Sequence, residues 1–400
     1  MIKWQVNILN YTEKISNNKK NLFIEILYIL IVFSNTLLTY AIPYQNITLE
    51  RIASRVILCS ALALFAICFF YSSVKYSNTK VVFGVILLCI STLITLLLNG
   101  INYDLIIKTL CYLSMSTVWY VMFFIGSKRI KKIIEISYTV QALIIILLFF
   151  GPYAYKPFVD INYVTVSDLL TLGFPNPNHI AIIIFSVIVV MFYFTVNKKG
   201  YIKVIYSLVI IFLSYMIYLT KSRTSLFCLI VFYCLYFYFK RDNRQRSYKI
   251  NKSLIFLILI SSLIFCLLYL LAFDKGLKDV QLFGKNFFSG REELYRLNLN
   301  ELKNNYLFGA AGITMFNNAH NGMLAILVNT GIIGTIAYIY VSFNALTALS
   351  KKIEKNRNRL AVFVGILSLF ILASGEAAVL TGGSMFYCNM LTMCVLCSIE

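Results

Sequence analysis

The sequence predicts an all-α polytopic membrane protein. Its 400 residues are 60% hydrophobic and 13% charged, whereas soluble domains are near 45–50% apolar and about 25% charged. Aromatic residues make up 16% of the chain, which argues against a disordered or fibrous protein. The apolar residues form continuous runs instead of the alternation that is typical of an outer-membrane β-barrel. A bundle of transmembrane helices is therefore the expected architecture.

Twelve apolar runs approach the roughly twenty residues that a helix needs to cross a bilayer. Their expected limits are 21–41, 52–73, 80–98, 103–126, 133–151, 170–196, 201–219, 224–240, 253–273, 319–342, 359–375 and 382–398. We expect about twelve transmembrane helices in a single integral membrane domain, residues 1–400. No small-residue cleavage site follows the first run, so we expect it to be a retained span rather than a signal peptide.

The distribution of basic residues predicts which loops are cytoplasmic. The net charge is +20, but Lys and Arg cluster in short gaps between apolar runs, a pattern that orients membrane proteins. If the N-terminus is cytoplasmic, the inner segments hold 24 of the 36 Lys and Arg residues. We therefore expect a multi-pass protein of the cytoplasmic membrane, with both termini in the cytoplasm and no nucleic-acid partner.

The longest non-apolar stretch, residues 274–318, falls on the outer side. Ser289 and Glu292 have the spacing of a capping box at a helix start. Apolar residues then recur at near-helical spacing, at Leu294, Leu297, Leu302 and Tyr306. We expect this large external loop to contain a short amphipathic helix that lies at the outer membrane surface.

A tight external turn after the seventh run carries two cations and no acid, in the order Lys221-Ser222-Arg223-Thr224. Lys221 is either a snorkelling cation at a helix end or electrostatic support for an anion site. Arg223 lies between two hydroxyl residues, and its planar fork of donors suits phosphate oxygens. The exposed N–H groups of the next helix start would add to such a site. Arg223 is therefore a candidate anion-binding residue, with a structural role as the alternative.

The chain has two histidines, and both fall at outer helix ends. His320 precedes the tenth run, where the helix dipole disfavours the imidazolium form. A neutral imidazole there could accept a proton as a general base, and a structural hydrogen-bonding role is the alternative. For His179, at the start of the sixth run, we expect a structural role, with contact to an acceptor sugar as the alternative. We expect Glu376, in the last external loop, to be a solvated turn residue, with substrate contact as the alternative.

Several catalytic motifs are absent from the sequence. It contains no Walker loop, dinucleotide fingerprint, H-E-x-x-H motif or serine nucleophile elbow. No loop carries a tight Asp-x-Asp pair that would hold a metal–nucleotide complex. We therefore expect neither a cytoplasmic nucleoside triphosphate as substrate nor a metal ion or other cofactor.

The glycine and His-Asn pattern near residue 320 resembles the signature of the O-antigen polymerase and O-antigen ligase family. That family shows a loosely spaced "lfGvG … HN … L … GiiG" pattern at the end of its large external loop. The matching residues here are Gly309, Gly312, His320, Asn321, Leu324, Gly331 and Gly334. Ala310 and Ala311 interrupt the first glycine pair, a departure that concerns the subfamily more than the chemistry.

Three further local matches occur in the family's order. Ser222-Arg223 resembles its "SR" turn, Ser289-Gly290-Arg291 its "sGR", and Asn176-Pro177-Asn178 its "NpN" before a span. The motifs cover residues 170–345, and the topology covers the whole chain. Glu293-Leu294-Tyr295 replaces the tryptophan that often follows the "GR" in the family, a second departure that concerns the subfamily.

The resemblance implies a GT-C-like fold and metal-independent glycosyl transfer at the outer face. The donor would be a glycan on undecaprenyl pyrophosphate, and the acceptor would be a sugar hydroxyl. Arg223 and Arg291 would stabilise the negative charge of the leaving pyrophosphate. His320 would take the acceptor proton or orient the hydroxyl, and Asn321 would hold the imidazole or a sugar. Asn178 and Lys221 complete the expected substrate-binding residues.

The motifs do not separate a polymerase from a ligase. The chain is rich in Ile, Asn and Tyr and favours Lys over Arg in several loops, a bias expected from an AT-rich genome. Such genomes are common among Gram-positive bacteria, which have no lipopolysaccharide core to act as a ligase acceptor. We therefore favour a polymerase of capsular or exopolysaccharide repeat units, with flippase and chain-length regulator proteins as partners. The alternatives are ligase-type transfer to another acceptor and a flippase for lipid-linked oligosaccharides, although a transporter usually carries more ionisable residues within its spans.

Overall fold

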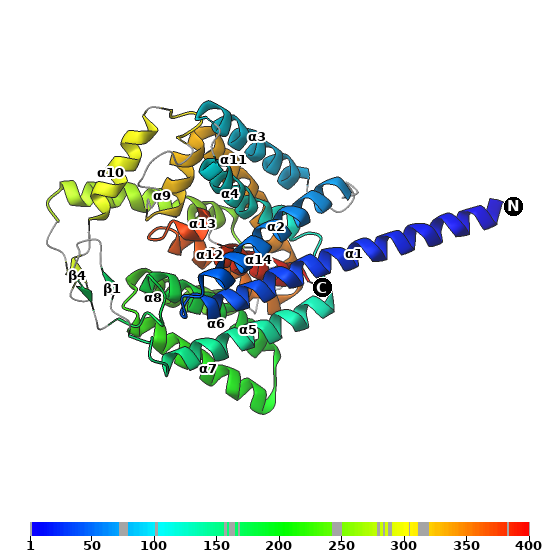
Figure 1. The fold of residues 1–400 in the computed structure, drawn as a ribbon, viewed down its shortest axis with the longest axis horizontal. Coiled ribbons are helices and arrows are strands. Elements are labelled where there is room, and N and C mark those ends of the chain that lie inside the picture. Colours follow the sequence, from blue (N-terminus) through cyan, green and yellow to red (C-terminus); the bar gives the residue numbers. More distant parts are fainter. Residues whose placement is uncertain are drawn as a thin grey trace.

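The computed structural model (Figure 1) describes residues 2–71, 79–100, 103–155, 158–159, 165–166, 169–241, 250–277, 281–282, 285–286, 290–303, 305–310, 320–381 and 384–399. Its helices in the first half are α1 (Ile2–Ala41), α2 (Ile47–Tyr71), α3 (Thr79–Leu98), α4 (Tyr103–Val121), α5 (Lys128–Phe149), α6 (Pro177–Asn197) and α7 (Gly200–Leu219). The second half contains α8 (Arg223–Arg241), α9 (Lys252–Asp274), α10 (Arg291–Leu302), α11 (Gly322–Lys355), the 3-10 turn Arg357–Arg359, α12 (Leu360–Leu372), α13 (Ala378–Thr381) and α14 (Ser384–Ser398). The strands within the described residues form two short antiparallel pairs, β1 (Phe158–Val159) with β2 (Thr165–Val166), and β3 (Gln281–Leu282) with β4 (Lys285–Asn286).

Within the described residues, nine helices are long and apolar enough to cross a membrane. They are α1 over Leu22–Ala41, α2, α3, α5, α6, α7, α8, α9 and α11. Helices α4, α12 and α14 occupy the positions of the other expected spans, but α12 has 13 residues and α14 has 15. The all-helical membrane class is confirmed, and the count of twelve full spans stays a prediction.

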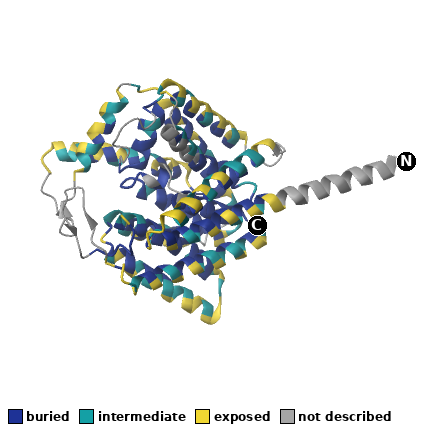
Figure 2. Ribbon diagram, in the orientation of Figure 1, coloured by how far each residue is buried: buried dark blue, intermediate teal, exposed yellow. Residues whose placement is uncertain are grey.

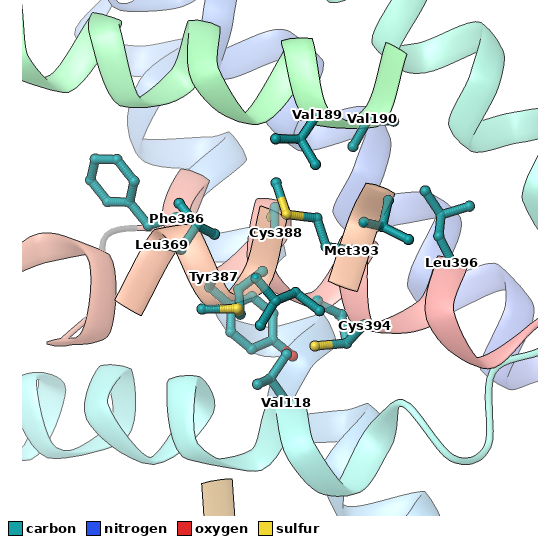
Figure 3. Packing of buried hydrophobic residues seen from close by; sticks show 14 of the residues in the cluster. Val118, Val189, Val190, Leu369, Phe386, Tyr387, Cys388, Met393, Cys394 and Leu396 are labelled. Carbon is teal, nitrogen blue, oxygen red and sulfur yellow. The ribbon is translucent and has the colours of Figure 1, made fainter. Parts of the chain in front are cut away.

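The short helices α12 and α14 form the centre of the core. All residues of α12 except Ile371 are buried, and the two helices lie among dark blue ribbons in Figure 2. Figure 3 shows α14 between Val118 of α4 and Val189 and Val190 of α6. Thirteen helical residues extend about 20 Å, less than the roughly 30 Å hydrocarbon core of a bilayer. The turn that follows α12, residues 373–377, is accordingly buried within the protein.

Helix α11 is interrupted at Gly331, whose φ of 66° and ψ of −169° are not helical. The segment 306–310 lies against this interruption and bonds to the backbone that the break leaves unpaired. Ala310 N–H donates to Val328 O at 2.8 Å, and Ile332 N–H donates to Tyr306 O at 3.0 Å. The segment 306–310 therefore satisfies backbone groups that the break in α11 leaves unpaired.

The same segment is tied to α3 by two side chains. Thr95 donates to the carbonyl of Phe308 at 2.6 Å, and Asn99 donates to the carbonyl of Gly309 at 3.1 Å. A Cβ on Gly309 or Gly331 would collide with the backbone of the opposite segment. The glycines of the sequence signature thus permit a close approach of two backbones, which fixes the first half of α11.

The structure changes two expected helix starts. Helix α6 begins at Pro177 rather than near residue 170, because Leu172 and Gly173 have positive φ and Pro175 disfavours helical geometry in the residue before it. The cap of α10 is Gly290, with φ of 76° and no side-chain cap bond. The expected capping residue, Ser289, lies outside the described residues.

Helix α10 is docked on the protein, with contacts to α9 and α11. Tyr295 and Asn298 form its buried face, whereas Leu297 is exposed. The expected helix of the external loop is present, but its most buried side chains are polar residues that pack on the bundle. In Figure 1 α10 lies at the end of the molecule opposite the C-terminus.

Candidate functional site

Glu376 links the start of α6 to the start of α10. Asn178 Nδ2 donates to Glu376 Oε1 at 2.7 Å, and Arg291 Nη2 lies 3.8 Å from the same oxygen. Glu376 is 2% exposed, so the expectation of a solvated turn residue is wrong. The reason is that α12 is short and central, which places the following turn inside the bundle. Burial raises the pKa of Glu376 to about 7, although Arg291 and the Asn178 hydrogen bond act to lower it.

Asn321 holds the turn 373–377 against the start of α11. Its Oδ1 accepts from Leu324 N–H at 3.0 Å and from the Ser262 hydroxyl at 2.7 Å. Its Nδ2 donates to the carbonyls of Ser262 at 2.8 Å and Ser374 at 3.2 Å. Asn321 is fully buried, and its amide is engaged by backbone and by Ser262. The amide of Asn321 therefore holds together the backbone next to His320, and its role toward the imidazole or a sugar stays a prediction.

His320 sits directly before this cap, with a φ of 43° and an exposed fraction of 7%. Its Nδ1 is buried and has no hydrogen-bond partner in the described part of the chain. Burial, together with neighbouring Arg291 and His179, lowers the pKa of His320 to about 4. The imidazole is therefore neutral at pH 7, with a polar atom available for a ligand.

Arg223 and Arg291 are the first residues of α8 and α10. Both lie close enough to the hydroxyl of Tyr269 to act on it electrostatically. A Cβ on Gly375 would meet Thr224 Oγ1 at 2.7 Å and Arg291 Nη1 at 3.2 Å, so both helix starts reach the turn 373–377. Cations at helix N-termini oppose the helix dipole. Two arginines and two helix starts together favour the binding of an anion.

Arg223, Arg291, His320 and Glu376 are called the charged cluster below. The other expected site residues differ in whether they contact it. Asn178 contacts it through Glu376. His179 packs edge-on against Phe386, with ring centroids 5.8 Å apart, and acts electrostatically on His320. Lys221 is exposed in its turn with a φ of 52°, and the described contacts do not join it to Arg291 or Glu376. Its role as a substrate contact stays a prediction.

Three residues in or near the charged cluster were not among the site residues expected from the sequence. Tyr295 is fully buried and donates to the carbonyl of His320 at 3.4 Å. Glu292 has a buried Oε2 that has no hydrogen-bond partner in the described residues. Glu376 had a detectable signal, because it is the single acid in the apolar stretch from residue 360 to 399, and an isolated acid in such a stretch is a functional candidate.

The charged groups of this cluster do not form a metal site. Throughout the described ranges, no group of three or more His, Cys, Asp or Glu side chains is arranged to hold a metal ion. The positive charge available for an anion comes from the guanidinium groups of Arg223 and Arg291.

A comparison with known protein families matches the segment of the chain that holds most of the expected site residues. Residues 207–339 match the family model described as O-antigen ligase. The matched region includes Arg223, Arg291 and His320, whereas Asn178 and Glu376 lie outside it. No characterised protein and no solved structure matched the chain.

Proposed function

We propose that this chain, whose residues 207–339 match the family model described as O-antigen ligase, is a polysaccharide polymerase of the O-antigen polymerase and ligase family. It joins undecaprenyl-pyrophosphate-linked repeat units into capsular or exopolysaccharide at the outer face of the cytoplasmic membrane. The observation that carries the proposal is that Arg291 acts electrostatically on the neutral, buried His320 and, together with Arg223, on Tyr269.

Arg223 and Arg291 hold the diphosphate of the donor. Negative charge grows on the diphosphate as the glycosidic bond breaks, and two guanidinium groups at helix starts are well suited to stabilise it. Both arginines lie on elements that are fixed by packing, α8 in the bundle and α10 on α9 and α11. Such preorganised charges lower the barrier because they need little rearrangement during the reaction.

His320 acts on the acceptor sugar through its Nδ1, which has no hydrogen-bond partner among the residues that the structure describes. The acceptor hydroxyl oxygen attacks the anomeric carbon, the bond from that carbon to the diphosphate oxygen breaks, and the hydroxyl proton passes to the imidazole. A pKa of about 4 makes His320 a weak base in the free protein. A bound diphosphate adds negative charge nearby, which raises the pKa of the histidine and makes it a better proton acceptor once the donor is present.

The acceptor separates a polymerase from a ligase. Both reactions use the same donor and the same residues, and the compositional bias of the chain favours a lineage without a lipopolysaccharide acceptor. The polymerase therefore extends one lipid-linked chain with another, and a flippase and a chain-length regulator of the same pathway are its partners. We expect this step to proceed without a metal ion, which the EDTA in the assay below tests.

The test is turnover by the purified protein in nanodiscs, with lipid-linked repeat units of its own strain and EDTA present. We expect a ladder of products that differ by one repeat unit, and its loss in a folded Arg223→Ala variant. If no polymer forms and vesicles that contain the protein instead move labelled lipid between leaflets, the enzyme is excluded and a flippase is indicated.

A further inference from the structure

The carboxyl group of Glu376 and the guanidinium of Arg291 are paired only loosely. Their closest atoms, Oε1 and Nη2, are 3.8 Å apart, whereas charge-assisted hydrogen bonds of this kind measure about 2.7–2.9 Å. Arg291 is partly buried, with 18% of its side chain exposed. Arg291 is therefore attracted by Glu376 but is not locked to it in a two-bond fork, and its donors can turn to another anion.

Asn178 holds the carboxyl in place independently of Arg291. Its Nδ2 donates to Oε1 at 2.7 Å, and a protonated carboxyl group keeps an oxygen that accepts this bond. The position of Glu376 is therefore compatible with both of its protonation states. The two protonation states differ in the charge of the carboxyl group that lies next to Arg291.

Two ionisable groups of α10, Arg291 and Tyr295, act directly on Glu376. Arg291 also acts on His320, together with His179 of α6. Arg223 and Glu292 act on Tyr269 of α9, together with Arg291. The arginines stay charged, His320 is neutral at pH 7, and burial raises the pKa of Tyr295 well above its usual value. Glu376, with a pKa of about 7, changes its charge in the physiological range.

We propose that Glu376 is a titratable counter-charge for Arg291, whose ionised form competes with the donor diphosphate and whose protonated form releases Arg291 to it. The inference rests on the proposed function, because it takes the diphosphate of that function as the competing anion. Glu376 is a positioning residue in this scheme, since it acts on the donor through Arg291. Donor binding then draws a proton onto Glu376, because the diphosphate replaces the attraction that Arg291 had exerted on the carboxylate.

The expected pH dependence follows from the sign of this competition. Below pH 7 Glu376 is protonated and Arg291 is free for the donor, and above pH 7 the ionised carboxylate opposes donor binding. If the protonated form is the binding-competent one, the apparent Kd for the donor rises about tenfold between pH 6 and pH 8. The ester-linked diphosphate of the donor keeps the same charge over this range, so the change belongs to the protein.

The experiment measures binding of an undecaprenyl-diphosphoryl glycan to the protein in nanodiscs between pH 6 and pH 8. The wild type is expected to show the tenfold weakening, and Glu376→Gln, which keeps the acceptor for Asn178, is expected to bind equally well throughout. His179 is unchanged in that variant, so a slope that persists in Glu376→Gln overturns the proposal. Asn178→Ala gives a second reading, because loss of its hydrogen bond raises the pKa of Glu376 and moves the midpoint to higher pH. A midpoint that stays in place or moves to lower pH in Asn178→Ala contradicts the proposal.

Arg291→Ala separates a failure of this inference from a failure of the function. Weak, pH-independent binding of the donor in Arg291→Ala supports both the proposed function and the role of Glu376. Weak binding in Arg291→Ala together with an unchanged slope in Glu376→Gln removes the role of Glu376 and leaves the function. Donor binding in Arg291→Ala that equals the wild type removes the diphosphate site, and with it both proposals.

Discussion

Asn178 and Glu376 are 198 residues apart in the chain and are joined by a hydrogen bond of 2.7 Å. This bond brings the start of α6 to the turn between α12 and α13, both outside the region that matches the family model. Arg291, inside that region, contacts the same carboxyl oxygen. The charged cluster is therefore assembled from segments inside and outside residues 207–339, the region that matches the family model.

Replacement of His320 tests its assignment to the acceptor. His320→Ala removes the imidazole but leaves both arginines, so kcat should fall by about 10²–10⁴ while the donor Kd changes by less than about twofold. Single-turnover rates and donor binding, measured on the same preparation, check this. A donor Kd that weakens as strongly as kcat falls would assign His320 to donor binding instead.

A lysine at position 291 tests whether the fork of donors matters. Arg291→Lys keeps the positive charge but loses the planar pair of N–H groups that match a diphosphate. We expect kcat/KM to fall by at least about tenfold, with Arg291→Ala lower still. Equal activity of wild type and Arg291→Lys would show that charge alone is sufficient at this position.

Glu376 is expected to make the stability of the protein depend on pH. The pKa of its carboxyl is raised from 4.5 to about 7 in the folded protein, so the folded state binds the proton more tightly than the unfolded state. The contribution of this carboxyl group to the free energy of unfolding is greatest below about pH 4.5. It falls as the pH rises through 7, by an amount on the order of 3 kcal/mol. Glu376→Gln should therefore raise the unfolding temperature at pH 8 and have little effect at pH 5. A larger gain at pH 5 than at pH 8 would contradict the buried, proton-binding carboxyl.

Asn321 should matter more for stability than an ordinary helix cap. Asn251 caps α9 with a bond to Ser253 N–H at the exposed surface, so Asn251→Ala should cost about 1 kcal/mol. Asn321→Ala also leaves buried partners at Ser262 and Ser374 unsatisfied, which adds about 1–3 kcal/mol. Thermal unfolding of the two variants in the same detergent checks the order. Equal losses would show that the bonds of Asn321 to Ser262 and Ser374 are not stabilising.

Gly331 should be intolerant of any side chain. Its φ and ψ lie in a region that is essentially restricted to glycine, and a Cβ would overlap the Leu307 carbonyl. Gly331→Ala is expected to lower stability by more than about 1–3 kcal/mol, measured by thermal unfolding. Gly126→Ala is the control, because nothing lies within 4 Å of its added Cβ. Wild-type stability in Gly331→Ala would mean that segment 306–310 does not depend on this close approach.

The sequence was sufficient to predict the helices and the positions of the main charged groups. Continuous apolar runs indicated the helices, polar residues at the ends of the runs indicated Arg223 and His320, and the family resemblance indicated Arg291. These features are local in the chain, so the physical requirements of a membrane reveal them without tertiary information.

The role of Glu376 depends on tertiary packing and could not be predicted in the same way. Its burial follows from the short helix α12, which has 13 residues and lies at the centre of the bundle. From hydrophobicity alone, this segment was expected to be a full membrane span. The contacts of Asn321 with Ser262 and Ser374 are likewise made between distant segments. The family resemblance implied that Asn321 holds the imidazole or a sugar, whereas in the structure Ser262 and Ser374 engage its amide.

The central claim is that Arg291 holds the donor diphosphate, and a matched pair of variants on α10 tests it most directly. Arg296 lies on the same helix, is exposed and pairs with Asp274, so Arg296→Ala removes an arginine without touching the cluster. The measurement is the rate of polymer formation from lipid-linked repeat units by both variants. The account predicts near wild-type turnover for Arg296→Ala and a rate about 10²–10³ lower for Arg291→Ala. Equal rates in the two variants, or a greater loss in Arg296→Ala, would contradict it.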